Sequence, residues 1–410
     1  MPAPKKTVRS LLVASATLLS LSVTAPAALA APAPSTSPAA TPPARVSAVG
    51  GTLLGQPGTQ VRLAPGVPVL PKDLTALSWI VSDAESGAVL AAHNAHWRLP
   101  PASTMKMLFA DTVLPRFPRE TRHKVAAKNL AGMGAGSSVV GIKEGQTYSV
   151  RDLWLGVFLR SGNDAVHVLS AMNGGVAQTV RDMQAHADEL QARDTHVISP
   201  DGYDEPGQVS SAYDLTLFAR SGLQKKDFRD YCSTVSAKFG NAEIRNTNRL
   251  LSGDTDVPVY RGIAGVKNGN TTNAGATFTG VAERNGKVLL VTVMNPQKHD
   301  HNEVYKETSK LFDWGFQAAG KVQPVGELVP PRSAASGTAQ PDPSGSPVQA
   351  SSGTAGSGAK PVAGAATSGG RGMGTAAAIA GGLLVLLAAG AFLVNRRWPL
   401  PDLVRRRTRP

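Results

Sequence analysis

A serine and a lysine lie three positions apart in the segment PPASTMKMLFADTVL, residues 100–114. Residues with this spacing share one face of a helix, so the Ser103 hydroxyl and the Lys106 amine come within reach of each other. Pro100-Pro101 prevents an earlier helix start and places Ser103 in the first turn, where free backbone N–H groups favour an oxyanion. A neutral Lys106 would then remove the hydroxyl proton and make Ser103 a nucleophile.

The same spacing also has a purely structural interpretation. A serine at the first turn of a helix is commonly an N-cap. The spacing recurs at Ser357 and Lys360, in a stretch of low complexity. The pair alone therefore leaves both a helix cap and a catalytic site open.

Two later segments carry polar groups that a serine hydrolase needs. The segment RSGNDAV places Ser161 and Asn163 at a helix–loop junction. There Ser161 can pass a proton, and the Asn163 amide can bond a lysine or a substrate carbonyl. The segment GVKNGNTTNAG places Lys267 at the end of a strand, with Gly269 allowing a substrate backbone to approach the sheet edge. Each segment by itself is equally typical of a turn.

The order of these motifs along the chain is more specific than any one of them. Ser-x-x-Lys, then Ser-x-Asn, then Lys-x-Gly on a late strand is the motif set of the penicillin-binding proteins and serine β-lactamases. Over most of residues 75–320 the sequence also resembles the D-alanyl-D-alanine carboxypeptidases of the low-molecular-mass penicillin-binding group. The matching stretches are PPASTMK, SGNDA, SPDGYDEPGQVSSAYDL, RNTNRLL and GVKNGNTTNAGATF.

The resemblance implies a reaction and a role for each matching residue. Ser103 would attack the carbonyl between the two terminal D-alanines of a peptidoglycan stem peptide, with Lys106 as its base. Ser161 would hand a proton to the departing D-alanine, and Asn163 would orient Lys106 and the peptide. Water would then release the acyl-enzyme. We expect β-lactam antibiotics to act as covalent inhibitors, and we expect no cofactor.

The resemblance also implies how the substrate is held. Lys267 would bind the terminal carboxylate, and its charge would help keep Lys106 neutral. The backbone N–H groups of Ser103 and Asn270 would form the oxyanion hole, in which one donor is typically worth roughly a hundredfold to a thousandfold in rate.

One residue departs from the family pattern. Asn268 stands between the lysine and Gly269, where the family has Thr or Ser. An amide N–H can replace the missing hydroxyl, and Thr271 offers a second hydroxyl nearby. We expect altered efficiency rather than loss of activity. The alternative is a catalytically impaired protein that only binds penicillin or the cell wall.

A second alternative is a serine β-lactamase. Glu205 is the acid placed roughly where class A β-lactamases keep their deacylating glutamate, although the surrounding SPDGYDEPGQ looks like the carboxypeptidase loop. No metal site is expected, because His299 and His301 in the segment KHDH supply too few ligands. We expect His93, His96 and His123 to be surface residues.

The ends of the chain carry targeting signals. Residues 1–30 combine three basic residues, an apolar run and the small-x-small site Ala28-Leu29-Ala30, the plan of a signal peptide. Residues 374–394 form an uncharged run long enough to span a bilayer as a helix. The arginine-rich tail, residues 395–410, would stay in the cytoplasm by the positive-inside rule. The sequence therefore predicts a single-pass membrane protein with an extracytoplasmic domain.

Composition divides the rest of the chain. Residues 31–70 and 323–373 are rich in Pro, Ala, Ser and Gly and are predicted to be disordered, which leaves a catalytic domain at residues 71–322. The net charge of +13 resides largely in the two targeting ends, so we expect no nucleic-acid partner. The single cysteine, Cys232, excludes an internal disulfide and is expected to be buried.

Hydrophobic periodicity predicts an α+β fold of the penicillin-binding transpeptidase type. Strand-like runs occur at both ends of the domain, as a hairpin around Glu85-Ser86-Gly87 and as three late strands with a tight turn at Asn285-Gly286. Helical patterns fill the middle, and a last helix covers about residues 302–319. We expect an antiparallel sheet formed from both chain ends, with a helical block between them.

Overall fold

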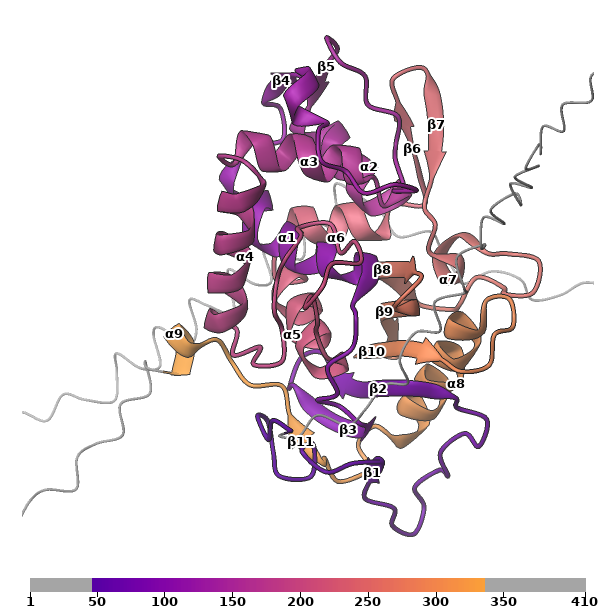
Figure 1. Ribbon diagram of the computed structural model, residues 1–410. Helices are drawn as coiled ribbons and strands as arrows, with labels where there is room; N and C mark the ends of the chain where they lie inside the picture. Colours follow the sequence, from indigo (N-terminus) through magenta and orange to yellow (C-terminus); the bar gives the residue numbers. More distant parts are fainter. Residues whose placement is uncertain (1–45, 336–410) are drawn as a thin grey trace, which may run out of the picture. The chain divides into compact units, whose positions relative to one another are not determined.

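A computed structural model describes residues 46–335 of the 410-residue chain (Figure 1). Its main sheet has seven strands in the order β1-β3-β2-β10-β9-β8, with β11 paired to β3, and every pairing is antiparallel. The strands are β1 (Thr59–Val61), β2 (Ala76–Asp83), β3 (Ala88–His93), β8 (Ile263–Thr271), β9 (Gly275–Arg284), β10 (Lys287–Pro296) and β11 (Gly326–Glu327). Early and late strands lie side by side, which confirms the predicted α+β fold class.

The turn between β9 and β10 was predicted from its two residues, and their conformation explains why it forms. Strands β9 and β10 are joined by Asn285 and Gly286, whose φ angles of 53° and 72° are both left-handed. Asn-Gly is the preferred pair for such a turn, because Asn tolerates and Gly freely adopts this conformation. The turn fixes the register so that Lys287 pairs with Arg284.

Most of the helices lie between β3 and β8 in the sequence, and the last two follow β10. The helices are α1 (Lys106–Val113), α2 (Val150–Arg160), α3 (Asn163–Met172), α4 (Val176–Glu189), α5 (Ala212–Gly222), α6 (Lys226–Ser233), α7 (Arg249–Ser252), α8 (Glu303–Ala318) and α9 (Arg332–Ala335). Shorter elements complete the fold: the hairpin of β4 (Arg122–Lys124) and β5 (Thr147–Ser149), that of β6 (Ser236–Phe239) and β7 (Ala242–Arg245), and the 3-10 turns η1 (Ala102–Met105), η2 (Leu114–Arg116) and η3 (Ala127–Asn129).

The sheet is buried on both faces, as strand β10 shows. Leu289, Val291 and Val293 belong to the core shared with α8, whereas Leu290 and Met294 belong to the core of the helical block. This alternation is the two-residue period of a strand. Helix α8 covers one face, and α5 and α6 contact the other (Figure 1).

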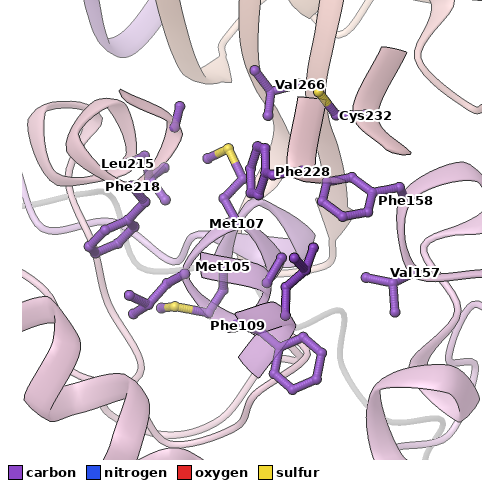
Figure 2. Close-up of a cluster of buried hydrophobic side chains, with 14 of the residues drawn as sticks. Met105, Met107, Phe109, Val157, Phe158, Leu215, Phe218, Phe228, Cys232 and Val266 are labelled. Atoms are coloured by element: carbon purple, nitrogen blue, oxygen red, sulfur yellow. The ribbon is translucent and has the colours of Figure 1, made fainter. Parts of the chain in front are cut away.

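Helix α1 runs through the helical core. Met105 and Met107 flank Lys106 in sequence and, with Phe109, pack among Phe158 and Phe228 (Figure 2). All five side chains are nearly or fully buried. Because close-packed side chains resist displacement, this packing fixes the start of α1 in space. Cys232 lies in the same core as a free thiol whose pKa burial raises to about 12, which confirms the expected buried cysteine.

The ordered domain is longer than predicted at both ends. Within the segment 31–70, the described residues 46–70 include strand β1 and the fully buried Leu54. Within 323–373, residues 323–335 include β11 and the buried Val325 and Leu328. The prediction of disorder was wrong for these parts, because a few apolar residues and pairing with β3 order them despite their Pro/Gly-rich composition.

One histidine prediction was also wrong. His96 is buried, with its Nδ1 2.6 Å from Asp194 Oδ2 and its Nε2 3.0 Å from the Val49 carbonyl. His96 thus links Val49 in the N-terminal segment to Asp194, which follows helix α4. His93 and His123 are partly exposed.

Both targeting predictions fall on residues outside the described range: the signal peptide at 1–30 and the membrane span at 374–394. Within residues 46–335, no helix has the length and apolar character needed to cross a bilayer.

Candidate active site

The backbone before Ser103 is held in an unusual conformation. Ala102, just after Pro101, has φ 51°, a left-handed value that costs an alanine roughly 1–2 kcal/mol. Ala102 is fully buried, so its surroundings impose the conformation. Ser103 follows in the 3-10 turn η1, and the α-helical geometry begins at Lys106.

Two glycines let the chain pass close to this turn. A Cβ at Gly269 would lie 2.7 Å from the Ser103 backbone nitrogen, and one at Gly202 would lie 1.9 Å from the Ala102 carbonyl oxygen. Neither site can accept a side chain without displacing the backbone around Ser103. Gly269 therefore brings β8 up to the nucleophile itself, whereas the sequence had indicated only an approach by substrate.

Lys106 is aimed at Ser103. Its Nζ donates hydrogen bonds to Ser103 Oγ at 2.8 Å and to the Asp201 carbonyl oxygen at 2.5 Å. Only 1% of the lysine is exposed. Burial lowers the pKa of Lys106 to about 8, although the Asp201 and Asp164 carboxylates act in the opposite direction. Ser103 makes no side-chain cap bond to the helix, so the simple N-cap interpretation is excluded.

Asp201 is a site residue that sequence reasoning missed. Besides holding Lys106 through its carbonyl, it accepts hydrogen bonds at its carboxylate from Ser199 Oγ and the Tyr203 backbone N–H, both at 2.9 Å. Burial raises its pKa, but the hydrogen bond from His167 and the charge of Lys106 outweigh burial and bring the pKa to about 2. Asp201 thus stays ionised beside the lysine. The signal available was its place in the matching SPDGYDEPGQ stretch.

Lys267 and Ser161 come together from opposite sides of the site. Lys267 Nζ donates to Ser161 Oγ at 3.1 Å and to the Asn268 carbonyl oxygen at 2.7 Å. Ser161 is the residue that ends α2, and it has a left-handed φ of 56°. Burial, and then the charge of Lys106, hold the pKa of Lys267 well below its usual value. Lys267 is 1% exposed and is not among the residues that line the two cavities described below, and its contact with a substrate carboxylate stays a prediction.

Asn163 lies at the start of α3 but does not hold Lys106. Its Nδ2 donates to Ser137 Oγ at 3.0 Å, and its buried Oδ1 has no hydrogen-bond partner among residues 46–335. The next residue, Asp164, accepts three backbone N–H groups of residues 140–142 at 2.8 to 3.0 Å. This carboxylate ties the loop over the site to the start of α3.

Asn268 and Thr271, near the end of β8, line two different cavities. Asn268 Oδ1 accepts a hydrogen bond from Thr247 Oγ1 at 3.1 Å, and both residues line one cavity. Thr271 Oγ1 donates to Asp204 Oδ1 at 2.7 Å and lines a second cavity instead. Thr271 therefore does not replace the hydroxyl missing at Asn268. Thr247 is the hydroxyl that lies beside it, and sequence reasoning did not single it out.

Ser103 lies where the two cavities meet. The first, of about 580 Å³, is lined by Ser161, Asn268, Gly269 and Asn270 near the nucleophile and by Asn295, Pro296 and residues 298–305 farther away. Its lining contains charges of both signs: Arg160, Arg249 and Lys298 on one side, Asp300 and Glu303 on the other. Lys298 pairs with both of these carboxylates, and Arg249 pairs with Asp254. The second cavity, of about 470 Å³, shares only Ser103, Ser138 and Asn270 with the first. Glu205 is exposed and lines neither of them.

Comparisons of the sequence with known proteins point to one family. A family model of D-alanyl-D-alanine carboxypeptidases matches residues 65–298, more than half of the chain. The carboxypeptidase DacB2 of Mycobacterium tuberculosis is 36% identical over 263 residues, covering 62% of this chain and 87% of that protein. DacD of Escherichia coli is 32% identical, covering 62% of this chain and 66% of that protein.

Solved structures are similar over the same region. A D-alanyl-D-alanine carboxypeptidase from Mycobacterium tuberculosis has a TM-score of 0.59 at 34% identity, covering 65% of this chain and all of that one. Penicillin binding protein 6B from Escherichia coli has a TM-score of 0.56 at 31% identity, covering 63% and 82%. Fold and site thus define a serine-type hydrolase of the penicillin-binding class. The chain belongs to the D-alanyl-D-alanine carboxypeptidase family.

Proposed function

We propose that this protein removes the terminal D-alanine from peptidoglycan stem peptides through an acyl-enzyme on Ser103. The observation that carries the proposal is the 2.8 Å hydrogen bond between Lys106 Nζ and Ser103 Oγ at the junction of two cavities. A nucleophile and its base need this contact, because proton transfer requires hydrogen-bond distance.

The first chemical step forms the acyl-enzyme. Neutral Lys106 takes the Ser103 proton while Oγ attacks the carbonyl of the penultimate D-alanine. The negative charge that develops on the carbonyl oxygen is placed against the backbone N–H groups of Ser103 and Asn270. Gly269 supports this assignment, since it lets β8 lie against the Ser103 nitrogen. Collapse of the tetrahedral intermediate breaks the C–N bond.

The leaving D-alanine needs a proton on its nitrogen. Ser161 is suited to deliver one, because its Oγ accepts a hydrogen bond from Lys267 and its own O–H is then free to donate. The proton that Lys106 took from Ser103 then replaces the one that Ser161 has given up, so Lys106 is neutral again. Water finally attacks the ester while Lys106 accepts the proton of the water, and this proton returns to Ser103 Oγ as the shortened peptide is released.

The first cavity is suited to the terminal carboxylate. Asn268 offers a neutral amide donor in the same lining as Ser161, with its Oδ1 held by the Thr247 hydroxyl, and Arg160 adds positive charge there. Charge-assisted hydrogen bonds to a carboxylate are roughly twice as strong as neutral ones. In this proposal Lys267 acts through Ser161, and the cavity lining contributes to the carboxylate contact that the sequence predicts for Lys267.

The proposal is tested by release of D-alanine. The full-length wild-type chain, incubated with diacetyl-L-Lys-D-Ala-D-Ala, is expected to release free D-alanine, and penicillin is expected to block the release by forming a covalent adduct detectable by mass. An adduct without peptide hydrolysis would favour the impaired penicillin-binding alternative. Rapid β-lactam turnover without peptide hydrolysis would favour the β-lactamase alternative, although the exposed Glu205 gives it no support.

We also propose that residues 374–394 anchor the domain on the outer side of the cytoplasmic membrane. The uncharged run followed by an arginine-rich tail supports this placement. Deletion of residues 373–410 is expected to move the protein from the membrane fraction to the soluble fraction without loss of peptide hydrolysis. A deleted protein that still sediments with membranes would contradict the anchor.

A further inference from the structure

His167 is a buried partner of Asp201 at the edge of the site. It lies on α3, one helical turn after Asn163, and its side chain is 7% exposed. Its Nδ1 is 3.1 Å from the Ala131 carbonyl oxygen, and its Nε2 is 3.5 Å from Asp201 Oδ2. The ring is thus held on one side by the segment that follows η3 and on the other by the residue whose carbonyl oxygen binds Lys106.

The two contacts of the ring determine its charge. A carbonyl oxygen can only accept, so the nitrogen that faces Ala131 carries a proton. Asp201 is ionised, with a pKa of about 2. A neutral ring would turn the lone pair of Nε2 toward this carboxylate, whereas a ring protonated at both nitrogens donates to both oxygens. The arrangement therefore favours an imidazolium, and His167 and Asp201 form a buried ion pair.

Asp201 transmits the effect of this ion pair to the base. Its carbonyl oxygen accepts a hydrogen bond from Lys106 Nζ at 2.5 Å. Burial lowers the pKa of Lys106, and the negative charge of Asp201 acts in the opposite direction. An uncompensated carboxylate would favour the protonated amine, which cannot accept the Ser103 proton. A positive charge on His167 opposes that effect and keeps the amine neutral.

The other titratable groups around the base come from α3 and β8. Asp164 of α3 raises the pKa of Lys106, as Asp201 does, against the larger lowering by burial. Burial, and then the charge of Lys106, lower the pKa of Lys267 on β8. Of the other elements packed against α1 or α3, none supplies an ion pair to Lys106 or Asp201 within the described part of the chain. In that part, His167 is therefore the ion-pair partner of the Asp201 carboxylate.

We propose that His167 is a positioning residue for acylation: its imidazolium neutralises and restrains Asp201, and thereby keeps Lys106 neutral as the base of the reaction. The inference rests on the proposed function and adds a residue that prepares its base. His167 lines neither cavity at Ser103, so it acts through Asp201 and not on the substrate. Its loss should change the pH at which the reaction proceeds rather than the limiting rate.

The pH dependence of acylation by penicillin tests the inference. In wild type the rate should rise with a midpoint near the Lys106 pKa of about 8. In His167→Gln the Asp201 charge is uncompensated, so the midpoint should move up by about one pH unit, and the rate at pH 7 should fall about tenfold. The limiting rate at high pH should stay close to that of wild type. A rate that falls equally at every pH would show a merely structural role and overturn the inference.

Further variants test whether the effect passes through Asp201. Asp201→Asn keeps the carbonyl that binds Lys106 but removes the charge, so its midpoint should move down by about one pH unit. In that background, His167→Gln should cause no further shift. His186→Gln, at another histidine paired with an aspartate, Asp111 of α1, should leave the wild-type midpoint unchanged. An unmoved midpoint in Asp201→Asn, or an equal shift in His186→Gln, would contradict the inference.

A measurement without substrate separates this inference from the proposed function. The pKa of Lys106 can be followed by the ¹³Cε shift of lysine-labelled full-length protein, with Lys106→Met to assign the signal. It should rise in His167→Gln by the same amount as the kinetic midpoint. A protein that shows this rise but releases no D-alanine would retain the inference and refute the proposed function. Release of D-alanine with an unchanged Lys106 pKa would do the reverse.

Thermal melting checks that the variants fold. Should His167→Gln unfold, His167→Asn takes its place, because its shorter amide can still donate to the Ala131 carbonyl oxygen. Should both unfold, the ring ¹⁵N shifts of wild type at pH 7 decide the matter. Two protonated nitrogens on His167 would support the imidazolium, and one unprotonated nitrogen would overturn it.

Discussion

Replacing Ser103 with alanine is expected to reduce D-alanine release by roughly four to six orders of magnitude. The substitution removes one oxygen from a side chain whose one hydrogen bond within residues 46–335 is donated by Lys106. The backbone conformation at Ala102 and the approach of Gly269 do not depend on that oxygen, so the oxyanion site should persist. Release of D-alanine from diacetyl-L-Lys-D-Ala-D-Ala, with intact-protein mass after exposure to penicillin, measures the loss of both hydrolysis and adduct.

The chain supplies its own control for this substitution. Ser357 precedes Lys360 by the same spacing as Ser103 precedes Lys106. Ser357→Ala is expected to leave both hydrolysis and adduct formation at wild-type levels. Substantial activity in Ser103→Ala would assign the nucleophile elsewhere and remove the basis of the proposed mechanism, particularly if Ser357→Ala were the variant that lost activity.

Local patterns were sufficient to predict the central strands but not the outer ones. The hairpin of β9 and β10 has a two-residue period and an Asn-Gly turn, both of which are readable over a short window. Strands β1 and β11 have three and two residues, and each is ordered by pairing with β3. Their stability is supplied by a distant segment, so no periodicity within them could reveal it.

The same limit applies to the site. Motif order predicts Ser103, Lys106, Ser161 and Lys267 as site residues. The structure joins them in two hydrogen-bonded pairs, Lys106 with Ser103 and Lys267 with Ser161. Asp201 holds Lys106 through a main-chain carbonyl, which every residue possesses and no side-chain pattern can mark.

Contacts between distant side chains were also beyond sequence reasoning. Asn268 was recognised as a departure from the family pattern, but its hydrogen-bond partner Thr247 lies 21 positions away in sequence. Asn163 matched its motif, yet its amide bonds Ser137 rather than Lys106. Motif order therefore identified the residues, whereas the assignment of partners required the fold.

Replacing Lys106 with methionine is expected to lower the rate of peptide hydrolysis and the rate of acylation by penicillin. Each rate should fall by roughly a hundredfold to ten-thousandfold. Methionine keeps an unbranched apolar chain in the core around α1 but cannot accept the Ser103 proton. It also leaves the Asp201 carbonyl oxygen without its donor, so a thermal melt must accompany the rate measurement. Lys360→Met, the matched change in the second Ser-x-x-Lys, is expected to have no effect.

The pH dependence of wild type identifies Lys106 as the base more directly. Only the neutral amine can take the proton, and with a pKa of about 8 roughly a tenth of it is neutral at pH 7. The acylation rate should therefore rise about tenfold per pH unit below 8 and level off above it. With an unshifted lysine the rate would still be rising at pH 9 and would level off only above about pH 10. A rate that is flat between pH 6 and 9, or a rise that survives in Lys106→Met, would show that another group accepts the proton.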